Sequence, residues 1–301
     1  MINGAIAAVG MIGVGLMGHG IASNILKHGY TVTLLSHPGN QPVDDLLGQG
    51  AAQTDSMAKI AQAADVIVLC VTGTPQVEGI LYQPDGLLKH LRPGIIIIDC
   101  STAIPSSTRK IARDVVAAGG RFLDAPMTRT PKEAAEGRLN LIVGGDPALL
   151  EHCRPLLESF AENIRHAGDI GSGHQMKLIH NFVSLGFSVV LSEAAACASR
   201  AGIDPRILLD ILESGGGNGV VLKRLAPYIA SGDGSGFRFT LANAHKDLGY
   251  YTTMAEQAGC FHDTATAILA VLALGLKAAP KSTMPELIDV LARAPEAGER
   301  R

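Results

Sequence analysis

The chain has 301 residues and a formal net charge of −3, with 25 basic and 28 acidic residues. This near balance gives no long-range field suited to a nucleic acid or an anionic membrane, so partners of those kinds are not expected. With 47% apolar residues, the chain can fill one large core or two ordinary ones. Its five cysteines are scattered and form no CxxC pair or metal-ligand spacing. The composition favours a reduced, cytoplasmic setting and predicts no metal site.

The segment before Lys27 is apolar enough to be tested as a signal peptide. It contains no basic residue, and its glycines have a spacing that an export signal does not require. No later stretch supplies about twenty uninterrupted apolar residues, the length that a membrane span needs. We therefore expect a soluble protein without an export signal.

Short β-like runs alternate with helix-like segments in the first half of the chain. The predicted strands are Ala7–Ile12, Thr31–Leu35, Val66–Val71, Ile95–Asp99, Arg121–Asp124 and Leu139–Val143. The predicted helices between them are Leu16–Lys27, Met57–Ala63, Thr74–Leu81 and Ser107–Ala118. This alternation is typical of an α/β Rossmann domain with a doubly wound, mostly parallel sheet.

The strand signal ends near residue 165. From Gly173 to Arg200 the chain has no proline and one internal glycine, Gly186, which predicts a helix roughly 40 Å long. Further helices are predicted at Pro205–Glu213, Val220–Ile229, Leu241–Ala258 and Met284–Ala292. We expect a Rossmann domain at 1–170, an all-helical substrate and dimerisation domain at 171–295 joined to it by a long interdomain helix, and a disordered tail at 296–301.

A glycine-rich turn follows the first predicted strand. Gly13, Gly15 and Gly18 form the pattern GxGxxG between that strand and the helix from Leu16. The first glycine permits a tight turn, the second lets the backbone approach a pyrophosphate, and the third lets helix and strand pack closely. Because a strand precedes it and a helix follows it, the pattern predicts a dinucleotide site at a helix N-terminus.

The end of the second strand distinguishes NAD from NADP, because an acid there binds the ribose 2′-hydroxyl and repels a 2′-phosphate. Here the strand is followed by Ser36 and His37 and then by Asn40, with no acid. These three side chains offer hydrogen bonds to a phosphate, although no arginine accompanies them. The sequence favours NADP, with NAD as the alternative.

A polar stripe marks the start of the long predicted helix. Lys177 and Asn181 are four residues apart and therefore share one face. The stripe on this otherwise apolar helix consists of His174, Lys177, His180, Asn181 and Ser184. A cleft at the domain junction explains such a stripe, and so does a solvated helix face.

Several motifs occur in a fixed order between residue 9 and about residue 260. They are the GVGLMG turn with Ala22 and Asn24, Asp99-Cys100-Ser101-Thr102 with Pro105, Asp124-Ala125-Pro126, Gly137 with Gly144-Gly145, the block Gly171–Asn181, and Lys246-Asp247-Leu248. In these motifs the chain resembles the β-hydroxyacid dehydrogenases, a family that includes the 3-hydroxyisobutyrate, tartronate semialdehyde and sulfolactaldehyde enzymes.

The resemblance implies roles for particular residues. The lysine matching Lys177 acts as general acid in carbonyl reduction and general base in alcohol oxidation, and the asparagine matching Asn181 orients the substrate. An ammonium beside the carbonyl oxygen stabilises the developing alkoxide and can deliver its proton. The Thr102 region resembles the family's contact beside the nicotinamide, and Lys246 resembles a lysine near the cofactor. The helical second half also suggests a homodimer.

The chain departs from the family at the substrate loop. The usual Val-Ser-Gly-Gly is replaced by Met127-Thr128-Arg129-Thr130, so the glycine N–H groups that hold a carboxylate are exchanged for a guanidinium. An Arg-Thr pair here resembles the sulfolactaldehyde reductase branch. Where relatives have two adjacent asparagines, this chain has His180 and Asn181. The anion stays open between sulfonate, phosphonate and carboxylate. A surface role for Arg129 and a core or capping role for His180 also stay open.

These inferences define a set of candidate residues. The expected cofactor contacts are Gly13, Gly15, Leu16, Met17, Gly18, Ser36, His37, Val71, Thr72, Thr102 and Lys246, and the expected catalytic pair is Lys177 and Asn181. The expected substrate contacts are Ser101, Thr128, Arg129, Thr130, His180 and Ser184.

The leading hypothesis is an NADP-dependent oxidoreductase that transfers a hydride between nicotinamide and a small anionic β-oxo or β-hydroxy compound. One alternative is an NAD-dependent 3-hydroxy carboxylate dehydrogenase of the 3-hydroxyisobutyrate or tartronate semialdehyde type. Another is a dinucleotide-binding sensor without turnover, against which the Lys177–Asn181 pair argues.

Overall fold

The structure is a computed structural model that describes residues 5–293. The chain divides into two compact units, residues 1–177 and residues 178–301, and the boundary falls inside one long helix, α8 (Ser172–Arg200). Each unit is described below by itself. The tail predicted to be disordered, 296–301, lies outside the described residues.

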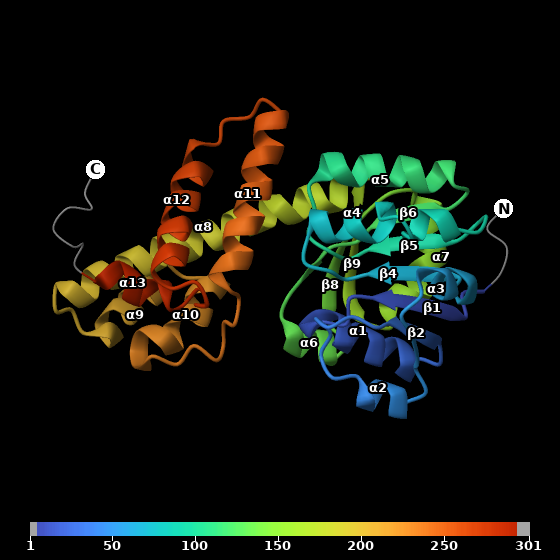
Figure 1. Cartoon of the computed structure of the whole chain (residues 1–301). Coiled ribbons are helices and arrows are strands. Elements are labelled where there is room, and N and C mark those ends of the chain that lie inside the picture. The colour runs from blue at the N-terminus through green and yellow to red at the C-terminus, as the bar shows by residue number, and fades with distance from the viewer. Residues whose placement is uncertain (1–4, 294–301) are drawn as a thin grey trace. The chain divides into compact units, whose positions relative to one another are not determined.

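The first unit is built on one sheet with the strand order β3-β2-β1-β4-β5-β6-β8-β7 and β9 paired to β8 (Figure 1). Its strands are β1 (Ala8–Ile12), β2 (Thr31–Leu35), β3 (Ala52–Thr54), β4 (Val66–Leu69), β5 (Ile96–Asp99), β6 (Arg121–Asp124), β7 (Met127–Thr128), β8 (Leu139–Gly144) and β9 (Ala161–Gly168). Strands β3 to β6 along this order pair in parallel, and β8 is antiparallel to β6 and β7. The turns after β1, β2, β4, β5 and β6 therefore lie at one carboxyl edge, and the connection reverses direction between β1 and β4.

Both faces of this sheet are buried. Successive residues of each strand point to opposite sides, and the side chains on each side pack into a separate core. In β5, Ile96 and Ile98 belong to one core, whereas Ile97 belongs to the other. The helices of this unit are α1 (Leu16–Lys27), α2 (Asp44–Gly48), α3 (Met57–Ala63), α4 (Thr74–Tyr82), α5 (Pro105–Ala117), α6 (Pro131–Ala135) and α7 (Pro147–Glu158), with a 3₁₀ turn η1 at Leu87–His90. Helices α1 and α7 supply the first core, and α3 and α5 the second. This is the predicted doubly wound Rossmann architecture.

The second unit is helical. After α8 come α9 (Pro205–Ser214), α10 (Val220–Ser231), α11 (Leu241–Gln257), α12 (Asp263–Ala278) and α13 (Leu287–Ala292). Helices α11 and α12 lie side by side (Figure 1) and share a core with α8, in which Leu185 packs with Leu248 and Leu272. The prediction of a Rossmann domain followed by a helical one is confirmed.

Helix α8 has 29 residues, as the uninterrupted pattern from Gly173 to Arg200 predicted. By length and composition alone it is apolar enough to cross a membrane, and half of its most apolar window is buried in the protein. A core helix of a soluble protein passes the same test, so this property is weak evidence for a span. The expectation of a soluble protein stays a prediction.

Candidate functional site

The turn between β1 and α1 has the shape that a dinucleotide needs. Gly13 adopts φ +94°, and a Cβ there would lie 2.4 Å from the carbonyl oxygen of Cys70. A Cβ on Gly18 would lie 2.0 Å from the carbonyl oxygen of Gly13, so helix and strand leave no room for a side chain. Around Gly15, by contrast, a Cβ would meet nothing within 4 Å. Gly15 therefore leaves open space at the point where a pyrophosphate approaches the backbone.

The start of α1 also suits an anion electrostatically. Its N-cap, Gly15, makes no side-chain capping bond, and the first turn contains no acidic residue. The first N–H groups of a helix lack partners within the helix and carry a partial positive charge. Leu16 is exposed and Met17 is half-buried in this first turn. These features fit the phosphates of a dinucleotide.

The turn after β2 contains one residue whose role the sequence did not reveal. Asn40 bridges two elements: its amide Nδ2 donates to the carbonyl oxygen of Leu35 at 2.9 Å, and its Oδ1 accepts from the N–H of Val14 at 3.1 Å. Asn40 thus ties the glycine-rich turn to the end of β2 instead of facing a phosphate with its whole amide. Ser36 and His37 are exposed at this strand end, where His37 Nδ1 accepts from the N–H of Gly39.

The turns after β4 and β5 are fastened to each other. Ser101 is buried, and its Oγ accepts from the N–H of Val71 at 3.1 Å. Its own N–H donates to Asp99 Oδ1 at 2.9 Å. Thr72 is exposed and Thr102 is half-buried in these turns. The structure therefore brings Val71, Thr72, Ser101 and Thr102 to the same sheet edge as Gly13.

Burial sets the electrostatics beneath these turns. It raises the pKa of Asp99, although His174 nearby and the N–H of Ser101 act in the opposite direction. Burial, with a contribution from the Asp99 charge, raises the pKa of the Cys70 thiol to about 12. Burial likewise raises the pKa of the Cys100 thiol well above its usual value. Both thiols are therefore protonated near pH 7 and are poor nucleophiles.

The predicted substrate loop begins with β7, and its three expected substrate contacts each have a partner in the chain. Thr128 Oγ1 accepts from Asn140 at 3.1 Å, and Thr130 Oγ1 donates to Glu133 at 2.5 Å in the first turn of α6. The Arg129 guanidinium donates to the Glu162 carboxylate and to the carbonyl oxygen of Arg138. The Glu162 side chain was not anticipated, because it lies 33 residues away.

Arg129 is also the one non-glycine residue with a positive φ, +83°, in the part of the chain that the structure describes. An L-residue in this conformation carries about 1 kcal/mol of backbone strain. The resemblance described above implies glycine at this position, and the observed φ is one that glycine favours.

Helix α8 starts beneath the carboxyl edge of the sheet. The Asp124 carboxylate at the end of β6 accepts from the N–H of Gly171 at 2.7 Å and from the N–H of His174 at 2.8 Å. His174 is fully buried, whereas Lys177, three residues later, is half-buried. The predicted stripe is therefore not a uniformly solvated face, since its first member lies in the interior.

In the second unit, one buried carboxylate organises the next turn of the stripe. Asn181 Nδ2 donates to Asp247 Oδ2 at 2.7 Å, and both residues are at least 95% buried. Lys246 Nζ forms an ion pair with Asp247 Oδ1 at 3.0 Å. His180 Nδ1 lies 3.1 Å from Asn181 Oδ1, and Ser184 Oγ lies 3.5 Å from the Asn181 carbonyl oxygen. The sequence predicted no role for Asp247 beyond its place in the Lys246-Asp247-Leu248 motif. In the structure its hydrogen bond fixes which way the Asn181 amide points.

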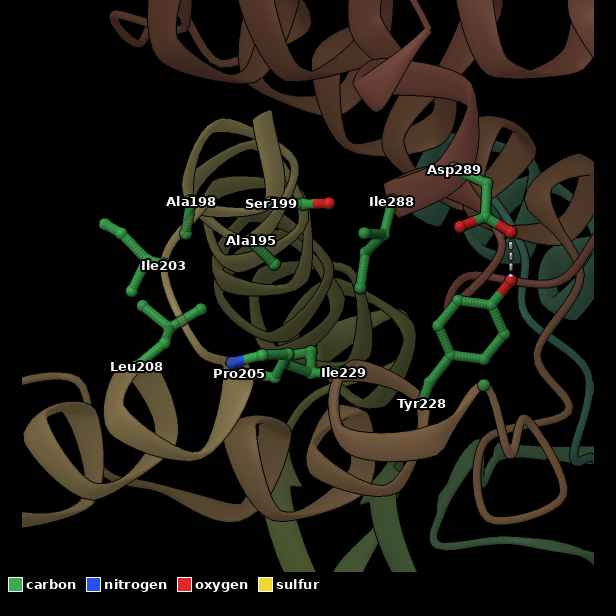
Figure 2. A pocket seen from close by; sticks show the side chains of 11 residues that line it. Ala195, Ala198, Ser199, Ile203, Pro205, Leu208, Tyr228, Ile229, Ile288 and Asp289 are labelled. Carbon is green, nitrogen blue, oxygen red and sulfur yellow. Dashed lines mark hydrogen bonds between the residues drawn. The ribbon is translucent and has the colours of Figure 1, made fainter. Parts of the chain in front are cut away.

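A separate hollow in the second unit contains none of the predicted site residues. It measures about 230 Å³ and is lined by side chains of α8, α9, α10 and α13 (Figure 2). Polar and apolar surface contribute about equally to its lining, and at one end Tyr228 donates to Asp289 at 2.6 Å. Ligand pockets usually exceed about 300 Å³. This hollow is therefore not a candidate for a dinucleotide. Within residues 5–293, no group of three or more histidine, cysteine or acidic residues is placed to hold a metal ion.

Two family models match the chain. Residues 8–168 match the NAD binding domain of 6-phosphogluconate dehydrogenase, and residues 171–287 match the NAD-binding domain of NADP-dependent 3-hydroxyisobutyrate dehydrogenase. Together they cover both units. A nicotinamide dinucleotide is therefore the cofactor of this fold.

Curated relatives and solved structures agree with this match. The chain is 36% identical over 211 residues to NAD-dependent L-serine dehydrogenase of Pseudomonas aeruginosa, covering 70% of each chain. It is 33% identical over 258 residues to 3-hydroxyisobutyrate dehydrogenase of the same organism, covering 82% of this chain and 85% of that one. It also superposes with a TM-score of 0.82 and 26% identity on Psf3 in complex with NADP+ and 2-OPP, covering 94% and 99% of the two chains.

The two glycines of the turn provide a matched test. Alanine at position 15 has space, so Gly15→Ala should leave thermal stability unchanged but lower dinucleotide affinity, because its methyl group occupies the approach to the backbone. Alanine at position 18 collides with Gly13, so Gly18→Ala should destabilise the first unit by about 1–3 kcal/mol as well. Thermal unfolding and NADPH titration of both variants measure the difference. Equal loss of stability in the two variants would contradict this account of the turn.

Proposed function

The chain belongs to the β-hydroxyacid dehydrogenase family, and we propose that within it the protein is an NADP-dependent oxidoreductase acting on a small anionic β-oxo or β-hydroxy compound. That it is an NAD(P)-dependent hydroxyacid dehydrogenase follows from its named relatives and matched family models. The preference for NADP, the charge of the substrate, a homodimeric assembly and a cytoplasmic location are parts of the proposal.

The observation that carries the proposal is the placement of Lys177. It lies three residues, nearly one helical turn, beyond His174 on a helix whose first turn is capped by Asp124 at the end of β6. When bound, the nicotinamide supplies a hydride to a carbonyl carbon or accepts one from an alcohol carbon. Lys177 completes this chemistry by giving a proton to the carbonyl oxygen, or by removing the hydroxyl proton in the reverse direction.

The second group on the same helix face is Asn181. Asn181 donates through its Nδ2 to Asp247, so its Oδ1 points away from that carboxylate. His180 Nδ1 lies beside this oxygen. We assign Asn181 to orienting the substrate and His180 to the anion. A rigid amide lowers the entropy lost when a small substrate is positioned.

The anion class is the finer part of the proposal. A guanidinium binds sulfonate, phosphonate or carboxylate with charge-assisted hydrogen bonds, and the change from glycine to Arg129 favours an anion larger than the usual carboxylate. The resemblance of the loop to the sulfolactaldehyde reductase branch supports a sulfonate or phosphonate. In the structure Glu162 holds the guanidinium, so an anionic substrate must compete with that carboxylate.

The second candidate is an NAD-dependent dehydrogenase of a 3-hydroxy carboxylate. The 36% identical relative, whose name describes an NAD-dependent L-serine dehydrogenase, favours it. Against it stands the end of β2, which carries Ser36 and His37 and no acid. A sensor that binds the dinucleotide without turnover is the weakest candidate, because it needs neither Lys177 nor the buried Asp247–Asn181 bond.

Lys177→Ala tests the chemistry. It should lower kcat by about 100-fold or more, the scale of general acid–base catalysis, and leave the Kd for NADPH nearly unchanged. The assay is NADPH oxidation with sulfonate, phosphonate and carboxylate carbonyls. Survival of activity to within about tenfold would remove the role assigned to Lys177. Tight NADPH binding without turnover of any of these compounds by the wild type would favour the sensor.

The ratio of kcat/KM for NADPH and NADH tests the cofactor. We expect the wild type to prefer NADPH, and Ser36→Asp to lower kcat/KM for NADPH about tenfold by repelling the 2′-phosphate. Ser36→Asn, which adds bulk without charge, is the matched control. A strong preference of the wild type for NADH would overturn this part of the proposal.

Arg129 is tested by two substitutions that differ in how well they tolerate the positive φ at this position. Arg129→Ala removes the guanidinium and keeps a strained residue, whereas Arg129→Gly removes it and relieves the strain. Both should raise KM for the anionic carbonyl about tenfold, since a hydrogen bond to a charged group contributes about 1.5–3 kcal/mol. Glu162→Gln should lower KM, because it releases the guanidinium. Unchanged selectivity among the anions in both Arg129 variants would place Arg129 outside the site.

A further inference from the structure

A buried cluster of five polar residues joins three separate segments of the first unit. We call it the polar junction: Asp99, Ser101, Thr108, Asp124 and His174, each at most 3% exposed. Asp99 ends β5, Ser101 follows it, Thr108 lies in α5, Asp124 ends β6 and His174 lies in the first turn of α8. Buried polar groups are costly unless they are bonded, so their bonds show what the cluster holds together.

The His174 ring forms the centre of the junction. Its Nε2 lies 3.1 Å from the carbonyl oxygen of Ser101, and its Nδ1 lies 2.8 Å from Thr108 Oγ1. A carbonyl oxygen can only accept, so Nε2 carries a hydrogen and donates it. One ring thus bonds the turn after β5 on one side and α5 on the other.

The backbone beneath the ring is equally fixed. Asp124 accepts from the N–H of Gly171 and of His174, and its negative charge at a helix N-terminus is favourable. A Cβ added to Gly173 would lie 2.4 Å from the carbonyl oxygen of Ile142, so the helix starts in close contact with β8. The first turn of α8 therefore has little freedom of its own.

The residues next to the junction are those assigned to chemistry. Ser101 adjoins Thr102, which is expected beside the nicotinamide. His174 precedes Lys177 by three residues, nearly one helical turn. The distance between the nicotinamide and the proton donor thus depends on how firmly the Ser101 turn is joined to α8.

We propose that His174 is a positioning residue, which holds the first turn of α8, and with it Lys177, in register with the Ser101–Thr102 turn. Its catalytic consequence rests on the function proposed above for Lys177. His174 itself touches neither substrate nor cofactor, since it is fully buried and its ring nitrogens face Ser101 and Thr108.

The charges around the ring decide which variants are informative. Asp99 Oδ2 lies 3.9 Å from Nε2, and Asp124 Oδ2 lies 3.8 Å from Nδ1. Asp99 Oδ2 makes no hydrogen bond of its own. An apolar residue at position 174 leaves these two carboxylates without the ring between them, so it costs stability as well as position. The test must separate the two effects.

His174→Gln and His174→Leu form the matched pair. The glutamine amide offers a donor for the Ser101 carbonyl oxygen and an acceptor for the Thr108 hydroxyl, whereas leucine offers neither. For the folded leucine variant we expect kcat to fall about tenfold or more, since misplacement by about 1 Å can cost 100-fold. Its Kd for NADPH should stay within about threefold of the wild type. The glutamine variant should recover most of kcat, a rescue that a packing role alone does not produce.

Hydrogen–deuterium exchange reports the coupling without any turnover. In the leucine variant, amides of residues 101–104 and 172–177 should both exchange faster, and in the glutamine variant both should keep their protection. If the leucine variant does not fold, Thr108→Val removes one bond of the ring with little change of shape, together with the bond of Thr108 Oγ1 to the carbonyl oxygen of Ile104 within α5. It should accelerate exchange at 172–177 and lower kcat about threefold.

Wild-type exchange in both segments of a folded leucine variant, with kcat within about twofold, would overturn the proposal. In the Thr108→Val variant the same pattern would count equally against it. A wild-type protein without turnover, combined with lost protection in the leucine variant, would instead overturn the proposed function and leave the junction standing.

Discussion

Parallel pairing of the central strands constrains everything else in the first unit. Because β2, β1, β4, β5 and β6 run the same way, their following turns gather at one edge, where no strand continues to satisfy the backbone. The chain fills that edge with polar contacts of three kinds. Asn40 bonds two turns, Ser101 bonds the next two, and Asp124 caps α8. What stays open is the space in front of Gly15, and this is the space that a dinucleotide needs.

Arg129 combines a charged side chain with a backbone conformation that usually belongs to glycine. Its φ of +83° is positive, and its guanidinium brings a positive charge to the loop. The Arg129 guanidinium donates to the Glu162 carboxylate, and this hydrogen bond lowers the pKa of Glu162. Glu162 is exposed and Arg129 is half-buried, and ion pairs that reach solvent contribute little to stability. In the proposed function, an anionic substrate therefore replaces Glu162 at little cost in stability.

Local patterns predicted the features that depend on local physics. The glycine turn, the strands β1, β2 and β6 and the long α8 follow from short-range sterics, alternation and the absence of proline, and the structure has them at nearly the predicted bounds. Short elements whose sequences resemble loops were not predicted. They are β3, β7, β9, α2 and α6. Helices α7 and α12 were also not singled out, although both are long enough to have given a signal.

The candidate site was predictable only in part, because its supporting contacts are distant in sequence. His174 was seen as one member of a polar stripe, but its partners Thr108 and Ser101 lie 66 and 73 residues away. No periodicity reveals such a contact. Likewise Asn181 was expected to orient a substrate, and the carboxylate that orients Asn181, Asp247, lies 66 residues further on. The Lys246-Asp247-Leu248 motif contained this aspartate, but only the fold shows that it accepts a hydrogen bond from Asn181.

The two units solve the same problem in the same way. Each holds one of the two groups assigned to catalysis through a buried carboxylate: Asp124 caps the turn that leads to Lys177, and Asp247 fixes the Asn181 amide. A buried carboxylate is costly unless all its partners are present, so it enforces one arrangement instead of several. The two aspartates therefore fix the positions of the site residues more than they stabilise the fold. A proton donor must be positioned to within a fraction of an ångström, so it depends on these contacts.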